Sequence, residues 1–441
     1  MESARPSPTD SALAQAGRAV MRNLGWLLAS RGVMAALSLV YLGIVARSLG
    51  VTGFGRFALI TGAAQALATL VAFQSWKVVV QYGVGLVGAG DRDGLGRLYK
   101  GAALLDLASA VVGAGLAVAI LETWSGALGI GPTLKRATLI FAVVQVLTIR
   151  STPLGILRLR DRFPAAAFAE SMTAVVRFLG AVVVGLVHPT VQGFMVAWGL
   201  AEVATASAYW IAAARTGDLG LLRRGRGVRG LLREHPGLLG FAVSTNANST
   251  LALGSKQVPL LAVGAVLGPA AAGTFRLAAQ LAQALAKFSQ LVSRAAFSEV
   301  VRAVRDAERA VVRRLLRRAV GLSLLAALAV MALVATAGDA VLRLVAGREV
   351  AGAYPILLVM AAAGCTEFTG TVFDTVMTAR DEAGLVFLIR CLGLVVVAAV
   401  ALAAMPLHGA LGMAMGVLAG SLASVGVMGG ASWWRLRPER G

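Results

Sequence analysis

The sequence predicts an all-α integral membrane protein with about twelve transmembrane helices, arranged as two six-helix bundles related by a pseudo-two-fold axis along the membrane normal. Three observations favour this fold. Of the 441 residues, 58% are hydrophobic and only 14% are charged, unlike an ordinary soluble domain. Apolar stretches of about 20 residues, the length needed to cross a bilayer, recur along the whole chain. A segment of the first half also reappears in the second half.

The expected membrane spans follow one another from residue 24 to residue 431. They cover residues 24–46, 57–76, 101–121, 137–157, 165–187, 190–213, 238–267, 273–297, 319–337, 352–379, 384–405 and 408–431. The alternating apolar and polar pattern of a membrane barrel is absent from the sequence, so helices are expected. The predicted domains are an N-terminal segment at 1–23, a bundle at 24–213, a basic linker at 214–237, a second bundle at 238–431 and a tail at 432–441.

The internal repeat relates the two bundles. LGVTGFGRFALITGAAQALA at 49–68 resembles LGPAAAGTFRLAAQLAQALA at 267–286, and an offset of 218 residues gives 11 identities in the 24-residue window that begins at Val45. The offset contains six spans, an even number, so both copies have the same orientation in the membrane. Two such bundles leave a cleft near the midplane, and rocking of the bundles would expose it to each side in turn.

The distribution of charge predicts the orientation. With the N-terminus inside, the inner segments hold 27 of the 41 basic residues, and the outer loops hold 7, including Arg276. By the positive-inside rule both termini are therefore cytoplasmic. The densest basic runs, at 223–233 and 302–318, are expected to lie against anionic membrane lipids. No nucleic acid is expected, because no aromatic stacking platform accompanies these runs.

A polar stripe crosses the eighth span. Steps of 3, 4, 3 and 4 residues place five side chains on one helix face: Gln280, Gln283, Lys287, Gln290 and Arg294. Arg31 and Lys256 are further cations within predicted spans. Each charge costs about 2.5–3.5 kcal/mol at the centre of a membrane helix, so these groups are expected to face protein or water. We interpret the stripe as a cavity wall; a buried structural network is the alternative.

Carboxylates occupy three other spans. Glu170 lies on one side of the fifth span with Thr173 and Arg177, and a neutralising pair between Glu170 and Arg177 is one interpretation. The sixth span sets four side chains on one face, Trp198, Glu202, Thr205 and Tyr209, and the tenth sets Glu367, Thr371, Asp374 and Thr378. Glu170, Glu202, Glu367 and Asp374 are candidates for proton or cation coupling, or for partners of cations across the cleft. The sequence leaves these roles open.

No catalytic residue, metal site or cofactor is expected. His188, His235 and His408 are scattered over loops and span ends, which argues against both a metal site and a catalytic base. GVGLVG at 83–88 fits the glycine pattern of a dinucleotide site, but it follows a membrane span rather than a β-strand.

Two stretches, ARSLGVTGFGRFAL at 46–59 and LGPAAAGTFRLA at 267–278, closely resemble the Wzx-type oligosaccharide flippase (polysaccharide biosynthesis) family of the multidrug/oligosaccharidyl-lipid/polysaccharide exporter superfamily. The resemblance covers essentially the whole chain. It implies translocation of undecaprenyl-pyrophosphate-linked sugars across the bacterial inner membrane, with a polysaccharide polymerase and other assembly components as partners. Such flippases commonly line their central cavity with cations, and the positions that fit here are Arg31, Lys256, Lys287 and Arg294.

Two other functions remain open. A multidrug and toxin exporter of the same superfamily would be expected to carry carboxylates where the first span carries Arg31. An integral-membrane glycosyltransferase or polymerase would need a large outer loop with catalytic side chains, whereas the longest outer loop expected here has about fifteen residues.

Overall fold

The computed structural model describes residues 8–124, 131–224, 228, 230–306, 309–347, 352–378 and 382–435. These residues form helices and short connections with no strand, so the expected fold class is confirmed. Ten stretches among them are long and apolar enough to cross a membrane. Two of the ten, Ala36–Gly88 and Val258–Ala286, each contain a turn and hold parts of two expected spans. Ten stretches therefore correspond to the twelve expected spans.

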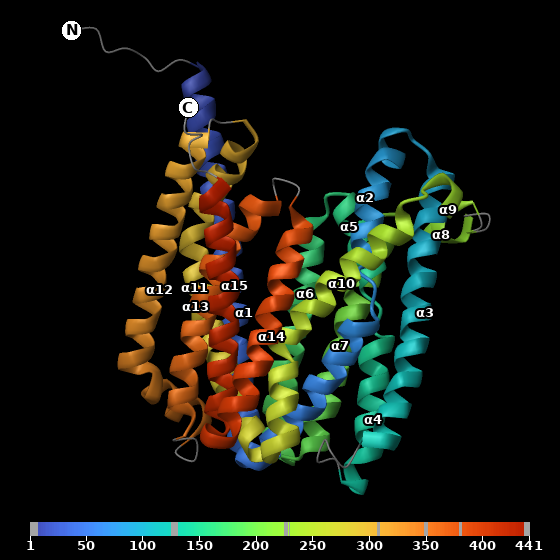
Figure 1. Ribbon diagram of the computed structural model, residues 1–441. Helices are drawn as coiled ribbons and strands as arrows, with labels where there is room; N and C mark the ends of the chain where they lie inside the picture. The colour runs from blue at the N-terminus through green and yellow to red at the C-terminus, as the bar shows by residue number, and fades with distance from the viewer. Residues whose placement is uncertain are drawn as a thin grey trace.

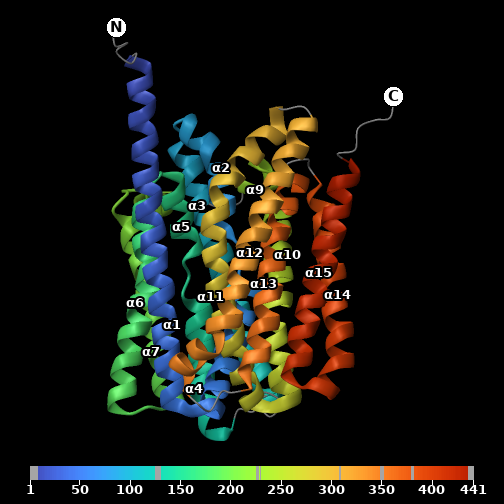
Figure 2. The same cartoon turned by 90° about the vertical axis from the view of Figure 1, so that its left-hand side faces the viewer.

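The helices run mostly parallel to one long axis, and α1 (Pro8–Val71) begins at the same end of the molecule at which α15 (Ala410–Arg435) ends (Figures 1 and 2). The N-terminal half contains α1 (Pro8–Val71), α2 (Ser75–Gly88), α3 (Arg92–Trp124), α4 (Pro132–Leu147), α5 (Ser151–Leu159), α6 (Phe163–Val187) and α7 (Val191–Ala214). The connection carries α8 (Leu219–Arg224) and α9 (Leu231–Glu234). The C-terminal half contains α10 (Leu238–Lys256), α11 (Val258–Asp306), α12 (Arg309–Ala346), α13 (Ala353–Thr378), α14 (Ala383–His408) and α15 (Ala410–Arg435).

The repeated segment forms the same turn in each half. Gly50 interrupts α1 with φ 65° and ψ 174°, and Gly268 interrupts α11 with φ 84° and ψ 176°. The two residues are separated by the repeat offset of 218. A Cβ at either glycine would meet nothing within 4 Å, so the backbone conformation, and not crowding, favours glycine at both positions. The duplication seen in the sequence is therefore also present in the backbone.

The two copies of the repeat contact each other reciprocally. A Cβ on Gly55 would lie 1.7 Å from the carbonyl oxygen of Pro269, and one on Gly273 would lie 2.6 Å from that of Val51. Val51 and Pro269 are equivalent positions of the repeat, as are Gly55 and Gly273. When residue i contacts residue j and their equivalents make the same contact in reverse, the contact lies on a two-fold axis. The pseudo-two-fold axis therefore passes between α1 and α11 at this point.

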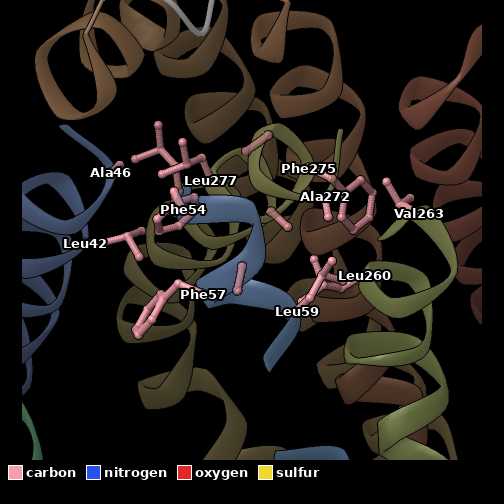
Figure 3. Packing of buried hydrophobic residues seen from close by; sticks show 14 of the residues in the cluster. Leu42, Ala46, Phe54, Phe57, Leu59, Leu260, Val263, Ala272, Phe275 and Leu277 are labelled. Carbon is pink, nitrogen blue, oxygen red and sulfur yellow. The ribbon is translucent and has the colours of Figure 1, made fainter. Parts of the chain in front are cut away.

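A single apolar core joins the halves around this contact. Figure 3 shows buried side chains of α1 and α11 in one cluster, Phe54 and Phe57 among them together with Phe275 and Leu277. The equivalent residues Phe57 and Phe275 are each 2% exposed. Equivalent sequence positions thus play the same packing role in both halves.

The connection between the halves is fastened to the N-terminal half. Arg160, just after α5, donates to Asp218 through Nε at 2.6 Å and Nη2 at 3.0 Å. These hydrogen bonds raise the pKa of the Arg160 guanidinium, because they stabilise its charged form. Tyr99 of α3 also donates to Asp218, at 3.1 Å. The beginning of the predicted linker is therefore packed against α3 and α5.

One residue lies where the sequence did not place it. Arg276 was counted among the outer-loop residues, although the expected span 273–297 contains it. It belongs to α11, eight residues after the turn at Gly268 and inside the apolar stretch Val258–Ala286. The outer turn is shorter than expected. Gly268 is the one residue of this turn with a non-helical backbone conformation, and the helix resumes directly after it. Arg276 therefore joins the set of intramembrane charges.

Candidate functional site

Two of the membrane spans in the N-terminal half are broken, and a cavity lies at the breaks. Residues 72–74 separate α1 from α2, and residues 148–150 separate α4 from α5. Both breaks line a cavity of about 490 Å³, the N-terminal cavity. Its wall comes from α1 to α7 of the N-terminal half and carries five ionisable groups of three acids and two arginines: Asp106, Arg150, Glu170, Arg177 and Glu202. Irregular backbone within a membrane span is tolerated where it lines such a cavity.

Asp106 of α3 holds the two broken helices together. Its Oδ2 accepts hydrogen bonds from Ser75 Oγ at 2.9 Å, Thr152 Oγ1 at 2.6 Å and the Thr152 backbone N–H at 3.0 Å. Ser75 begins α2 and Thr152 lies in the first turn of α5. The positive ends of two helix dipoles therefore stabilise one buried carboxylate. A further bond, from Trp76 N–H to Ser151 Oγ at 3.0 Å, joins the same two helix starts.

Glu202 of α7 lies between two arginines. Its side chain is 2% exposed, and its two oxygens pair with Arg150, which precedes α5, and with Arg177 of α6. Arg177 also stacks over the Trp198 ring, 3.9 Å from its centroid. Trp198 in turn packs edge-on against Tyr41, with ring centroids 5.2 Å apart. The buried carboxylate is thus neutralised by groups from two other elements, as a buried charge requires.

The remaining carboxylate of the cavity also has a donor. Glu170 accepts a hydrogen bond from Tyr209 at 2.7 Å, and Thr173 and Thr205 bond to each other across α6 and α7 at 2.8 Å. Three of the four residues placed on one face of the sixth span, Trp198, Glu202 and Tyr209, line the N-terminal cavity. The expected pair between Glu170 and Arg177 is wrong, because Arg177 pairs with Glu202 of the neighbouring helix.

A second, smaller cavity lies where α10 gives way to α11. This junction cavity, of about 10 Å³, has room for about one water molecule. Its polar lining comprises Lys256, Arg276, Gln280 and Gln283. Gln280 Oε1 is buried without a hydrogen-bond partner in the described part of the chain. Three of the predicted cleft residues are therefore gathered at one site, with Arg276 added.

The junction cavity adjoins the N-terminal half. Gln257, next to Lys256, donates to Gln65 of α1 at 3.3 Å. Arg276 lies within electrostatic range of Tyr41 and of Arg177, which lines the N-terminal cavity. The basic groups of the C-terminal half thus face the polar groups of the N-terminal half across α1.

The two carboxylates expected on the tenth span lie on α13 in the C-terminal half. Asp374 pairs with Arg390 of α14 at 2.6 Å. Glu367 lies within electrostatic range of Lys256 and Arg390. Neither carboxylate lines the N-terminal cavity. Their roles in coupling stay predictions.

Four predicted site residues have side chains outside the described part of the structure. Arg31 lies on α1, and Lys287, Gln290 and Arg294 lie on α11. The cleft that these residues would line between the halves stays a prediction. Among the described residues, no group of three or more His, Cys, Asp or Glu side chains is placed to hold a metal ion.

The sequence analysis missed three contributors: Arg276, Asp106 as the link between α2 and α5, and the pairing of Arg150 with Glu202. A signal existed for Arg276, since it stands four residues before Gln280 and continues the stripe of the eighth span. The other two depend on contacts between residues 31 to 52 positions apart, which helical spacing does not reveal.

The sequence of the chain matches one family model and one curated relative. A family model described as "Polysaccharide biosynthesis protein" matches residues 44–355. The "Inner membrane protein YghQ" of Escherichia coli is 28% identical over 293 residues, which cover 65% of this chain and 81% of that protein.

Solved structures show the same fold. An inward-facing multidrug resistance MATE family transporter of the MOP superfamily is 15% identical with a TM-score of 0.74, covering 92% of this chain and 94% of that one. Lipid II flippase MurJ in an inward closed conformation is 12% identical with a TM-score of 0.71, covering 91% and 86%. The fold is therefore that of MOP superfamily transporters, with two lobes.

Proposed function

Because the chain belongs to the polysaccharide biosynthesis protein family, we propose that it is a flippase for polyprenyl-pyrophosphate-linked oligosaccharide. It acts in the bacterial inner membrane, the location that the name of its relative, Inner membrane protein YghQ, states. By alternating access it supplies lipid-linked oligosaccharide for the synthesis of surface polysaccharide. Lipid II flippase MurJ, which shares the fold, is named for moving a lipid-linked cargo.

The observation that carries the proposal is Arg276 beside Lys256 at the junction cavity. Arg276 lies inside an apolar stretch with no carboxylate partner among the described residues. An unpaired cation in a membrane span costs about 2.5–3.5 kcal/mol or more, so a ligand that carries negative charge would stabilise it. Arginine matches phosphate through two parallel hydrogen bonds, and lysine adds a point charge. A pyrophosphate head group has this chemistry, and the junction cavity, which holds about one water molecule in this structure, would have to widen to admit it.

The polar stripe of α11 extends this site along the helix. Arg276, Gln280 and Gln283 continue to Lys287 and Arg294 with helical spacing, and Arg31 would add a cation from α1. Beside the turns at Gly50 and Gly268, Gly55 and Gly273 hold α1 and α11 in close contact, and this contact would close the outer end of the molecule. With the termini in the cytoplasm, the substrate would enter from the cytoplasmic leaflet and leave when this contact opens. A polysaccharide polymerase would then use the product.

The proposal is tested by neutralising the basic groups in a strain that needs this chain for its surface polysaccharide. We expect Arg276→Gln to weaken substrate binding about ten- to hundredfold, the loss of one charge-assisted contact. Lys287→Ala combined with Arg294→Ala should abolish export. The measurements are the surface polysaccharide and the lipid-linked oligosaccharide that accumulates inside. Arg343→Gln is the control, because Arg343 is an exposed member of an i,i+4 pair on α12.

The multidrug exporter is the second candidate, since the N-terminal cavity carries three carboxylates and a MATE transporter shares the fold. It predicts that deletion of the chain raises sensitivity to organic cations and leaves surface polysaccharide intact. That result, or normal export by the variants at normal protein levels, would overturn the flippase.

A further inference from the structure

The N-terminal cavity is separate from the basic groups assigned to the pyrophosphate. Every residue that lines it belongs to the N-terminal half, between Thr61 and Tyr209. Its volume of about 490 Å³ lies within the range of roughly 300–1,000 Å³ that is usual for ligand pockets. The cavity is therefore large enough for a ligand or for a part of one, and the pyrophosphate does not account for it.

The charges in this cavity disfavour an ionic ligand. The wall carries three carboxylates and two guanidinium groups, so its negative charges outnumber its positive charges and it repels a phosphate. A cation would have to compete with donors that already occupy each carboxylate. Glu202 is occupied by two arginines, Asp106 by Ser75 and Thr152, and Glu170 by Tyr209. The ligand that fits this balance is polar and uncharged.

The rest of the wall combines amides and hydroxyls with large aromatic rings. Gln65, Gln74, Gln145 and Thr69 supply groups that both donate and accept hydrogen bonds, as the hydroxyls of a sugar also do. The rings of Trp76 and Trp198 line the same space. Arg158 lies 4.0 Å from the Trp76 centroid, and Arg177 holds Trp198 in the same way, so both rings are fixed. The negative π face of an aromatic ring attracts the C–H groups of a sugar ring.

We propose that the N-terminal cavity is a saccharide subsite, which binds the uncharged sugars of the lipid-linked substrate while the pyrophosphate lies at Arg276 and Lys256. This assignment rests on the proposed function. The two sites adjoin, because Arg177 lines the cavity and lies within electrostatic range of Arg276. The pseudo-symmetric halves thus take different parts of one substrate.

The experiment crosses two variants, Gln145→Leu and Arg276→Gln, and one control variant with two probes on the purified full-length protein in nanodiscs. One probe is inorganic pyrophosphate. The other is the phosphate-free oligosaccharide released by mild acid from the lipid-linked intermediates of the same bacterium. Gln145→Leu removes an amide from the wall at nearly constant volume, and no hydrogen bond of the Gln145 side chain holds the described part of the fold together. Gln81→Leu is the matched control, because Gln81 is exposed and outside the cavity.

We expect the oligosaccharide to bind the wild-type protein and to change tryptophan fluorescence. Gln145→Leu should weaken this binding about fivefold, as for one lost hydrogen bond, and leave pyrophosphate binding unchanged. Arg276→Gln should do the reverse, and Gln81→Leu should affect neither probe. Thermal unfolding of each variant shows whether it is folded.

Each other outcome counts against one of the two proposals. If the wild-type protein binds pyrophosphate through Arg276 but not the free oligosaccharide, or if Gln145→Leu binds the oligosaccharide as tightly as wild type, the saccharide subsite is wrong and the flippase stands. If tetraphenylphosphonium binds in the cavity and neither probe binds, both proposals fail in favour of a cation exporter.

Discussion

The fifth and sixth membrane spans of each half form equivalent hairpins, which are held together by different contacts. These hairpins are α6 with α7 in the N-terminal half and α14 with α15 in the C-terminal half. In the N-terminal half, Arg177 pairs with Glu202 and Thr173 bonds to Thr205. In the C-terminal half, the backbones of α14 and α15 touch through glycines, since a Cβ on Gly420 would lie 2.6 Å from the carbonyl oxygen of Gly393. Small residues let the backbones of membrane helices approach closely, whereas polar side chains join helices through hydrogen bonds across a wider gap.

This difference accompanies the position of the larger cavity. Arg177, Glu202 and other polar side chains of α6 and α7 line the N-terminal cavity, as do the breaks before α2 and α5. The glycines of α14 and α15 instead bring the two backbones together. One duplicated fold has therefore produced a half specialised for polar contacts and a half whose basic groups gather on α11.

The largest expected effect comes from removing the carboxylate between the two arginines. Glu202→Leu leaves Arg150 and Arg177, whose side chains are 29% and 17% exposed, without their counter-charge, which should destabilise the protein by up to about 3–5 kcal/mol, the upper end being the loss for a fully buried pair. Thermal unfolding in detergent measures the loss. Replacing Arg150 and Arg177 by Met in the same protein should restore most of the stability, since no unpaired charge remains. Equal instability of the single and triple variants would mean that the polar contacts do not hold the N-terminal hairpin.

Gly55→Ala tests the contact on the pseudo-two-fold axis. The new Cβ would lie 1.7 Å from the Pro269 carbonyl oxygen, so α1 and α11 must separate, at a cost of about 1–3 kcal/mol. We expect a lower melting temperature and a cysteine pair placed across this end to crosslink less readily. Gly85→Ala is the control, because a Cβ there would meet nothing within 4 Å. Unchanged crosslinking in Gly55→Ala would show that this contact does not close the end of the molecule.

Asp106→Asn tests the link between the broken helices. The charge that the two helix starts stabilise is lost and one hydrogen bond is mismatched, so stability should fall by about 1–3 kcal/mol. Oligosaccharide binding should weaken further than pyrophosphate binding, because the breaks shape the N-terminal cavity. Asp161→Asn should be neutral, since Asp161 has φ 53°, which Asn tolerates. If the binding of both probes weakens equally, Asp106 stabilises the whole protein and has no particular effect on the N-terminal cavity.

The smallest effect is expected for the ion pair of the C-terminal half. Arg390 and Asp374 have side chains that are 41% and 26% exposed, and such pairs contribute about 0–1 kcal/mol. Arg390→Gln should therefore change the melting temperature far less than Glu202→Leu. A loss as large as that of Glu202→Leu would remove the contrast between the halves.

The sequence alone determined the features that depend on local pattern. Apolar length gave the spans, and the offset of 218 residues gave the equivalent turns at Gly50 and Gly268. The face of Trp198, Glu202, Thr205 and Tyr209 was predicted because helical spacing fixes which side chains share a side.

The tertiary structure decided which groups meet and where the space lies. Glu202, and not Glu170, pairs with Arg177, Arg276 lies within a helix and not in a loop, and the larger cavity lies inside the N-terminal half. Helical periodicity specifies only the direction in which each side chain points around the axis of its own helix. The partner of a side chain depends on the rotation and distance of neighbouring helices, which are set by packing over the whole molecule.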